Sequence, residues 1–250
     1  KSLSSKKLNN TQYARLDVVY FNRAAKVGSE AMMELLETMH KGSPNNVTVI
    51  TKGPFESRSR LLPQKQQMIK SVWIADLDPG SIFIEHGNWL DFPGFKLPKP
   101  IYINLVRDPV DRVISWYYYI RGGYRNAIFY RRFRDHPIKP EAFFKKNFND
   151  CVRTGDPECQ YIPNTTNERT GNYMRQTLFF CGNERQCLPF NSPRSVQLAK
   201  MNVERDYAVV GSWEDTNVTL TVLEAYIPRF FKDIRKVFEC RFHRIPIPKT

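Results

Sequence analysis

The stretch Asp17-Val-Val-Tyr-Phe21, continued by Asn22-Arg-Ala-Ala-Lys-Val-Gly-Ser29, decides the fold. Its first part is a short run of β-branched and aromatic residues, which is typical of a buried strand. Beyond Gly28, apolar residues recur at the spacing of a helix: Met32, Leu35, Leu36 and Met39. Val47-Thr-Val-Ile50 then reads as the next strand. Together these segments predict a β-α-β unit whose crossover is long enough for parallel strands.

The same alternation of strand, loop and helix continues along the chain. We expect a helix over 64–74, strands over 81–85 and 100–106, and a helix near 218–227. Asp108 can cap a further helix with Pro109 at its first position. The part after about Gly122 is basic, contains the cysteines and reads as loop-rich. The pattern predicts an α/β fold with a central, mainly parallel sheet flanked by helices.

Composition excludes some classes of protein and leaves others open. In 250 residues, 38 Lys and Arg stand against 25 Asp and Glu, a formal net charge of +13. Hydrophobic residues at 41% and aromatic residues at 13% exclude a disordered chain. A run of about 18 apolar residues, as a membrane span needs, is absent from the sequence. The charge favours a polyanionic partner, which can be nucleic acid, an anionic membrane face or an acidic polysaccharide.

Sequons and cysteines both bear on the compartment. One Asn-x-Ser/Thr sequon is usually chance, but four favour a secretory protein: Asn9, Asn46, Asn164 and Asn217. The cysteines lack the spacing of a zinc knuckle, so we expect no metal site. Buried free thiols are the alternative. Beside the sequons we prefer two local disulfides, Cys151–Cys159 and Cys181–Cys187, with Cys240 left over.

Two candidate anion sites follow strands whose carboxyl ends meet at one edge of the predicted sheet. The loop over 23–29 offers a glycine, a hydroxyl, the Lys26 ammonium and a helix start, although an ordinary turn with a solvated lysine is the alternative. Arg107 leaves the strand over 100–106 beside a helix start, with Ser115 two turns along. A guanidinium matches phosphate oxygens. The two sites predict a ligand with two separated phosphates.

An ordered series of motifs matches one family. The motifs are Asn22-Arg23…Lys26, Glu85-His86…Leu90-Asp91-Phe92, Pro100-Ile-Tyr-Ile-Asn104, Arg107-Asp-Pro109, Ser115-Trp-Tyr-Tyr-Tyr119, Phe179-Phe-Cys-Gly182 and Leu223-Glu-Ala225…Pro228-Arg-Phe-Phe231. They resemble the heparan sulfate and uronyl 2-O-sulfotransferases, Golgi enzymes that use 3′-phosphoadenylyl sulfate (PAPS). Within that family the chain is most like the insect Pipe-type members. The resemblance runs from about Val18 to Phe231.

The resemblance implies a nucleotide-kinase-like sulfotransferase fold and a set of donor-binding residues. Arg23, Val27, Gly28 and Ser29 would line the 5′-phosphosulfate around Lys26, which would stabilise the leaving phosphate oxygen. Arg107 and Ser115 would hold the 3′-phosphate. His86 falls where the family has its catalytic base. The reaction needs such a base, and a neutral imidazole with a pKa of about 6.5 can take the proton of a sugar hydroxyl. A hydrogen-bonded structural histidine is the alternative for His86 alone.

The basic stretch over 121–146, with its interleaved aromatic residues, is the expected acceptor surface. By the resemblance it binds an acidic glycan through Arg121, Arg125, Arg131 and Arg132, and Arg23 is expected to reach the acceptor carboxylate. A solvated charged face and a single-stranded nucleic acid site are the alternatives. The sequons and paired cysteines argue against nucleic acid. The expected reaction is sulfuryl transfer to the 2-hydroxyl of uronic acid residues in a glycosaminoglycan, with a Pipe-type role in dorsal–ventral patterning and without a metal.

The ends of the chain and two substitutions depart from the family pattern. We expect residues 1–15 to be a stem or linker and residues 16–250 a single domain, atypical or truncated after about 231. The family also implies a Golgi lumenal enzyme, an N-terminal signal anchor absent from this chain, and a homotrimer. Glu30 and Ala25 replace residues usual in the family. The alternative function is a catalytically defective isoform that acts as a glycan-binding or assembly partner.

Overall fold

The central feature is a parallel sheet of five strands in the order β2-β3-β1-β4-β5. The computed structural model describes residues 14–41, 47–55, 61–160, 176–189 and 192–242. The strands are β1 (Arg15–Phe21), β2 (Thr48–Ile50), β3 (Ser81–Ile84), β4 (Pro100–Val106) and β5 (Tyr207–Ser212). β1 lies in the middle, between β3 and β4. The predicted α/β class with a parallel sheet is confirmed, and β5 is a strand that the sequence did not predict.

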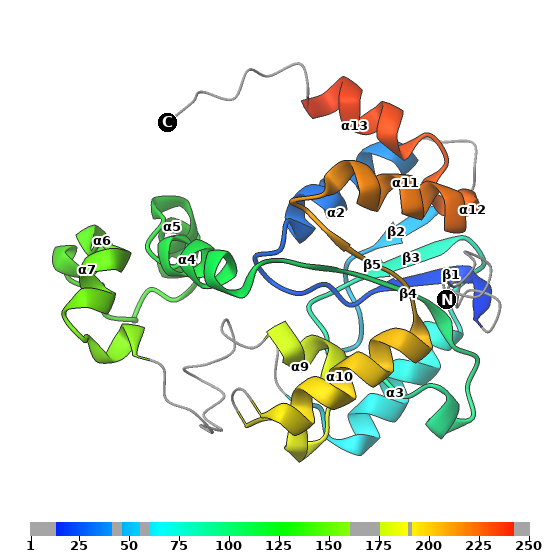
Figure 1. Ribbon diagram of the computed structural model, residues 1–250, viewed down its shortest axis with the longest axis horizontal. Helices are drawn as coiled ribbons and strands as arrows, with labels where there is room; N and C mark the ends of the chain where they lie inside the picture. Colours follow the sequence, from blue (N-terminus) through cyan, green and yellow to red (C-terminus); the bar gives the residue numbers. More distant parts are fainter. Residues whose placement is uncertain (1–13, 42–46, 56–60, 161–175, 190–191, 243–250) are drawn as a thin grey trace, which may run out of the picture.

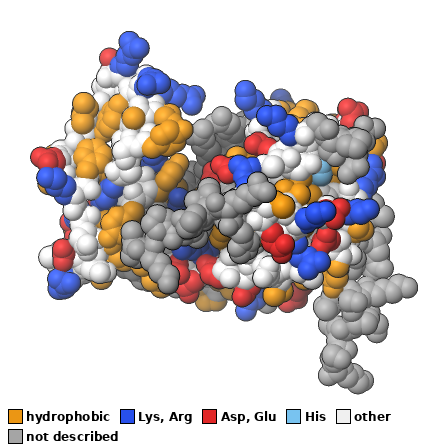
Figure 2. Space-filling model, turned by 90° about the horizontal axis from the view of Figure 1, so that it is seen from above, with side chains coloured by type: hydrophobic (Ala, Val, Ile, Leu, Met, Phe, Trp, Pro, Cys, Tyr) orange, Lys and Arg blue, Asp and Glu red, His pale blue; other side chains and the backbone are white. Residues whose placement is uncertain are grey.

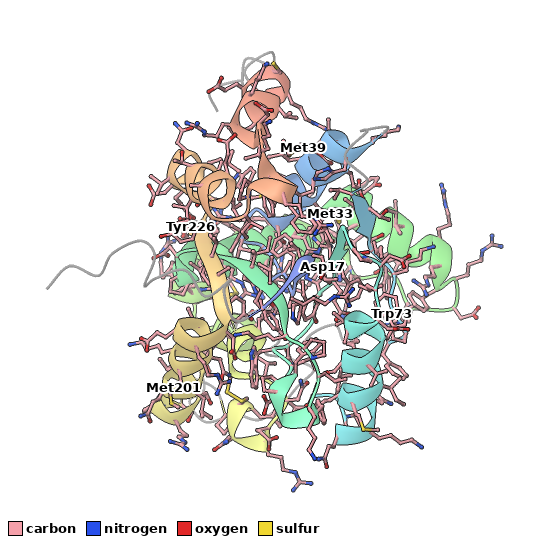
Figure 3. The ribbon with its side chains drawn as sticks, turned by 90° about the vertical axis from the view of Figure 1, so that its right-hand side faces the viewer. Asp17, Met33, Met39, Trp73, Met201 and Tyr226 are labelled. Carbon is pink, nitrogen blue, oxygen red and sulfur yellow. A yellow bond between two sulfur atoms is a disulfide. The ribbon has the colours of Figure 1, made fainter. Side chains whose placement is uncertain are left out.

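Helices cover both faces of this sheet (Figure 1). One face carries α2 (Ser29–His40), α11 (Thr216–Tyr226), α12 (Pro228–Phe231) and α13 (Ile234–Phe242). The other carries α3 (Gln64–Ala75), α9 (Gln176–Cys181) and α10 (Pro193–Asp206), with the short turns η2 (Pro93–Phe95) and η5 (Arg185–Cys187) nearby. Figure 3 shows Met33, Met39 and Tyr226 on the first side and Trp73 and Met201 on the second. The sheet is therefore the middle of three layers.

Burial explains why the strands read as unbroken apolar runs. Val18 to Phe21 in β1 are at most 1% exposed, and every residue of β3 is buried. Such runs are typical of parallel strands that are covered on both faces. Aromatic rings from neighbouring strands also contact one another on the side of α3 and α9, at centroid distances of 5.5 Å for Tyr20–Phe83 and 5.0 Å for Tyr102–Tyr207. The core thus fixes the sheet that supports the loops at its carboxyl edge.

A separate group of helices projects beyond the carboxyl ends of the strands (Figure 1). We call residues 109–159 the lobe; it contains α4 (Pro109–Tyr119), α5 (Gly123–Arg132), α6 (Glu141–Lys145), α7 (Phe148–Arg153) and η3 (Pro157–Cys159). The sequence indicated loops after Gly122, whereas the structure has short helices there. Helices of five and six residues, such as α6 and α7, carry too few turns to show a periodicity.

Both preferred disulfides are confirmed. Cys151–Cys159 closes the lobe with Cα atoms 5.8 Å apart, and Cys181–Cys187 joins α9 to η5 at 5.7 Å. Cys240 is exposed and unpaired with another cysteine. Among the sequons, Asn217 lies exposed on α11, and the others are outside the described residues: Asn9, Asn46 and Asn164.

The predicted stem lies mostly outside the described residues, which start at Ala14. Of the tail expected after about residue 231, the part up to Phe242 is described, and it contains α13. β1 begins at Arg15, one residue inside the expected stem. Among the residues that the structure describes, none of the helices combines the length and the apolar character needed to cross a bilayer.

Candidate active site

The loop over 22–28, between β1 and α2, is fastened to the sheet by buried side chains of β4 and β5, which lie far along the sequence. The Asn104 amide, from β4, donates to the Asn22 carbonyl at 2.8 Å and accepts from the Ala24 N–H at 3.2 Å. The Tyr207 hydroxyl, from β5, donates to the Asn22 side-chain oxygen at 2.9 Å. Asn22 and Asn104 are at most 2% exposed. The loop therefore has a fixed backbone, which a site for a charged ligand requires.

Two residues of this loop have a left-handed backbone. Lys26 has φ 65° and Gly28 has φ 82°. A Cβ placed on Gly28 would lie 2.4 Å from Cγ of Trp213, the residue after β5. Only glycine meets both the backbone conformation and the close approach of the indole. The glycine singled out in the sequence is thus required by packing as well as by the turn.

One face of α4 lies against the same loop. The Arg112 Nε donates to the Ala25 carbonyl at 2.7 Å, and the Lys26 ammonium lies 4.0 Å from the ring centroid of Tyr119. Ser115 is partly exposed one turn before Tyr119, on the same helix face. The Asp108 side chain caps α4 by accepting from the backbone N–H groups of Val110 and Asp111, as the sequence predicted. Thus α4 brings a cation, a hydroxyl and an aromatic ring to the loop.

The charges of the two predicted anion sites act on each other. Burial lowers the pKa of the Lys26 ammonium, Glu30 opposes this change, and the positive charge of Arg107 lowers the pKa further. Burial also lowers the pKa of the Arg112 guanidinium to about 10, so it remains charged at neutral pH. The loop and the start of α4 therefore place the cations Lys26, Arg107 and Arg112 in one region.

Carboxylates already pair with two of the predicted phosphate ligands. Arg23 Nη1 lies 2.7 Å from Glu30 Oε1, and Arg107 Nε lies 3.3 Å from Glu214 Oε1. Glu30 is 69% exposed and Glu214 is 44% exposed, so both can turn into solvent. The acidic residue that departs from the family pattern at position 30 is therefore an ion-pair partner of Arg23.

His86 follows β3 and its ring is fixed by the loop. Nδ1 of His86 lies 3.0 Å from the Arg23 carbonyl oxygen. A carbonyl oxygen only accepts, so Nδ1 carries the hydrogen and Nε2 bears the lone pair of the neutral ring. Just before it, the Glu85 carboxylate accepts from Lys70 Nζ and from the Tyr20 hydroxyl, both at 2.7 Å. This buried network holds the end of β3 that presents the histidine.

The structure brings four predicted site residues to the carboxyl edge of the sheet: Arg23, Lys26, His86 and Arg107. Two other predicted ligands point into the protein. The Val27 side chain is fully buried, and the Ser29 hydroxyl, 2% exposed, donates to the Ala24 carbonyl at 2.9 Å. Val27 and Ser29 can therefore offer a ligand only their backbone N–H groups.

The basic stretch divides into a buried and an exposed part. Arg121 differs from the expectation, because it is 6% exposed and its guanidinium binds both Glu158 oxygens at 2.7 Å. It is thus an internal tie of the lobe. Arg125 is partly exposed and lies 5.3 Å from the Tyr119 ring centroid, while Arg131 and Arg132 are exposed at the end of α5. Figure 2 shows apolar and basic side chains together on the lobe, at its left.

Sequence reasoning missed several residues that shape this site. Arg112 had a usable signal, because it stands three residues before Ser115 and so shares its helix face. The sequence around Asn104 and Tyr207 shows no such pattern, since their contacts with Asn22 depend on the strand order. Glu214 follows an unpredicted strand.

Comparison with known proteins agrees with this geometry. A model of the sulfotransferase family, Sulfotransfer_2, matches residues 10–239. The uronyl 2-sulfotransferase homolog pip of Drosophila melanogaster is 44% identical over 92% of this chain and 45% of its own length. The heparin sulfate O-sulfotransferase of Drosophila melanogaster is 31% identical, and the human heparan sulfate 2-O-sulfotransferase 1 is 29% identical, each over 88% of this chain and 58% of its own length. The chain spans about half the length of these curated relatives. It belongs to the sulfotransferase family.

Proposed function

We propose that this chain transfers a sulfuryl group from PAPS to the 2-hydroxyl of uronic acid residues in a glycosaminoglycan or a related glycoconjugate. One observation carries the proposal. Three adjacent strands end together, and each contributes one required group: the Lys26 loop follows β1, His86 follows β3 and Arg107 follows β4. The names of the sulfotransferase relatives support the same reaction class.

The donor would bind across the loop over 22–28 and the start of α4. Lys26 and the N-terminus of α2 suit the phosphosulfate, and Arg107 with Ser115 suits the second phosphate. The donor supplies an activated sulfuryl group with a phosphate as leaving group. The residues fit it electrostatically, since the Lys26 ammonium lies close enough to the Arg107 guanidinium for that charge to lower the pKa of Lys26.

Each catalytic side chain then has a defined task. His86 accepts the hydroxyl proton at Nε2, because its Nδ1–H is held by the Arg23 carbonyl. The acceptor oxygen forms its bond to sulfur as the bond from sulfur to the phosphate oxygen breaks. Lys26 donates to that leaving oxygen and stabilises its developing charge. The exposed residues Arg131 and Arg132 and the partly exposed Arg125 would hold the acidic acceptor, whereas Arg121 is buried.

The proposed compartment is the lumen of the Golgi apparatus. The two disulfides favour an oxidising environment of this kind. The sequons point the same way.

The test is incubation of the purified chain with sulfate-labelled PAPS and desulfated heparin or dermatan. We expect labelled uronic acid with the wild type and loss of label by at least about a hundredfold in His86→Ala and Lys26→Ala. Controls are His40→Gln, at the far end of α2, and Lys65→Ala, exposed on α3. Equal activity in His86→Ala would contradict the assigned base.

A glycan-binding partner without catalysis is the second candidate. The observation in its favour is that Glu30 and Glu214 pair with Arg23 and Arg107, which the donor needs. Calorimetry with adenosine 3′,5′-bisphosphate separates the two functions. Binding supports the enzyme, whereas heparin binding without nucleotide binding supports the partner.

A further inference from the structure

The Lys26 ammonium lies over an aromatic ring instead of beside a carboxylate. Its Nζ is 4.0 Å from the centroid of Tyr119, the last residue of α4. Within the described ranges, no carboxylate forms an ion pair with Lys26, although Glu30 acts on it through space. A cation over the face of a tyrosine ring is attracted by the ring quadrupole, and more so when it is partly shielded from water.

This contact belongs to a set that fixes the Lys26 segment from one side. Arg112, Ser115 and Tyr119 follow one another at helical spacing along α4. Arg112 donates to the carbonyl of Ala25, and the ring of Tyr119 contacts the side chain of Lys26. Lys26 itself has a left-handed backbone, with φ 65°.

A lysine side chain with four rotatable bonds needs such a partner to keep its ammonium in place. Tyr119 is 44% exposed, and its ring contributes little to the core. The same ring also lies 5.3 Å from the guanidinium of Arg125, a partly exposed cation of the proposed acceptor surface. Tyr119, at the end of the first helix of the lobe, is therefore near a cation of the donor loop and a cation of α5.

We propose that Tyr119 is a positioning residue, whose ring holds the Lys26 ammonium where the leaving phosphate oxygen of the donor is formed. The consequence for catalysis rests on the proposed function, whereas the contact between Lys26 and Tyr119 is independent of it. The π face carries the effect, and the hydroxyl is not required. Phenylalanine at position 119 should therefore preserve the positioning of Lys26, whereas leucine or methionine there should not.

The first test detects the contact without any reaction. In a protein with ¹³C-labelled lysine, the ε-methylene protons of Lys26 are expected upfield of the other lysines, because they lie in the ring current; Lys26→Ala identifies the signal. Tyr119→Phe keeps the shift, and Tyr119→Leu and Tyr119→Met abolish it. An unshifted Lys26 signal in the wild type, or a shift that survives in both variants without a ring, overturns the proposal.

The second test measures catalysis. We expect Tyr119→Leu to lower kcat roughly two- to thirtyfold, the range of one cation–π contact, with a smaller change in donor KM. Tyr119→Phe stays within about twofold of the wild type. Tyr124→Leu is the matched control, since Tyr124 is 84% exposed on the same lobe. Thermal unfolding confirms that each variant folds.

The two hypotheses fail in different ways. If the wild type transfers no sulfate, the proposed function fails, while the Lys26 signal still decides the contact. If the wild type is active and Tyr119→Leu matches it in kcat, or Tyr119→Phe loses as much as Tyr119→Leu, the positioning role is refuted.

Discussion

The loop over 22–28 and the part of the lobe beyond α4, residues 120–159, both carry positive charge, but they are held in opposite ways. Buried side chains from β4, β5 and α4 fasten the loop: Asn104, Tyr207 and Arg112. In the lobe, α5 and α6 contain no buried residue. The lobe depends instead on a disulfide, the Arg121–Glu158 pair and ring contacts such as Tyr117–Phe148 at 5.1 Å.

This difference suits two kinds of ligand. A small donor with fixed phosphate positions needs cations that do not move, because electrostatic stabilisation depends on preorganisation. A polymer with variable side groups is better met by exposed cations on a region of low local stability, which can adapt. The loop supplies the first arrangement and the lobe supplies the second.

The largest expected effect comes from breaking the support of the sheet edge. Lys70→Met leaves the Glu85 carboxylate, 10% exposed, without its cation. We expect a loss of about 3–5 kcal/mol in the free energy of unfolding, because an uncompensated buried charge remains. Urea unfolding measures it, and Lys65→Met on the exposed face of the same helix is the control. A loss below about 1 kcal/mol would show that the edge is held by other contacts.

Removal of the lobe disulfide should affect ligand binding by the lobe and leave ligand binding by the loop unchanged. The double variant Cys151→Ser with Cys159→Ser is expected to cost about 2–3 kcal/mol of stability, the value for a short closed loop. The change should weaken heparin binding and leave affinity for adenosine 3′,5′-bisphosphate unaltered. Calorimetry with both ligands checks this, and a parallel fall in nucleotide affinity would mean that the lobe and the loop are one unit. Removal of Cys181–Cys187 is the matched comparison.

A smaller effect is expected at Glu30. If Arg23 binds the donor as proposed, its pair with Glu30 competes with that ligand, so Glu30→Gln should raise affinity for adenosine 3′,5′-bisphosphate by about two- to fivefold, the range of an exposed ion pair. Added salt should reduce the difference between variant and wild type. Glu37→Gln, exposed on the same helix, is the control. A weaker affinity in Glu30→Gln would show that Glu30 is needed to orient Arg23.

The smallest effect concerns pH. Burial and Arg107 lower the pKa of Lys26, so Lys26 loses its proton at a lower pH than an exposed lysine does. Its charge is complete below that pKa and falls as pH rises through it, so kcat should decline early on the alkaline side. Lys26→Arg, which stays charged, should move this decline to higher pH even where its maximum rate is reduced. Identical alkaline limbs would assign the decline to another group.

Much of the fold was predictable from local pattern. Buried apolar runs gave β1, β3 and β4 close to their true bounds, and Asp108 with Pro109 marked the start of α4. β5 was missed because Tyr207–Ser212 directly follows α10 and ends in Gly211 and Ser212, which reads as a loop. Short lobe helices lacked the length for a periodic signal.

The sequence predicted which charged side chains lie at the site, but it did not predict the residues that pair with them or hold the loop. Lys26, Arg107 and His86 stand beside strand ends, which a strand pattern can locate. The Tyr207–Asn22 and Arg107–Glu214 contacts join segments whose proximity follows only from the strand order. The burial of Arg121 was hidden for a similar reason, since Glu158 lies beyond three short helices.

The central place of β1 has a consequence for how the protein acquires its site. The His86–Arg23 and Ala24–Asn104 hydrogen bonds span 63 and 80 residues of chain. Contacts between such remote segments form late, since loop-closure entropy opposes them until the sheet is assembled. The anion site should therefore be absent from partly folded chains that already contain helices. Capture of adenosine 3′,5′-bisphosphate during refolding would then report the final closure of the sheet, after far-ultraviolet circular dichroism has recovered.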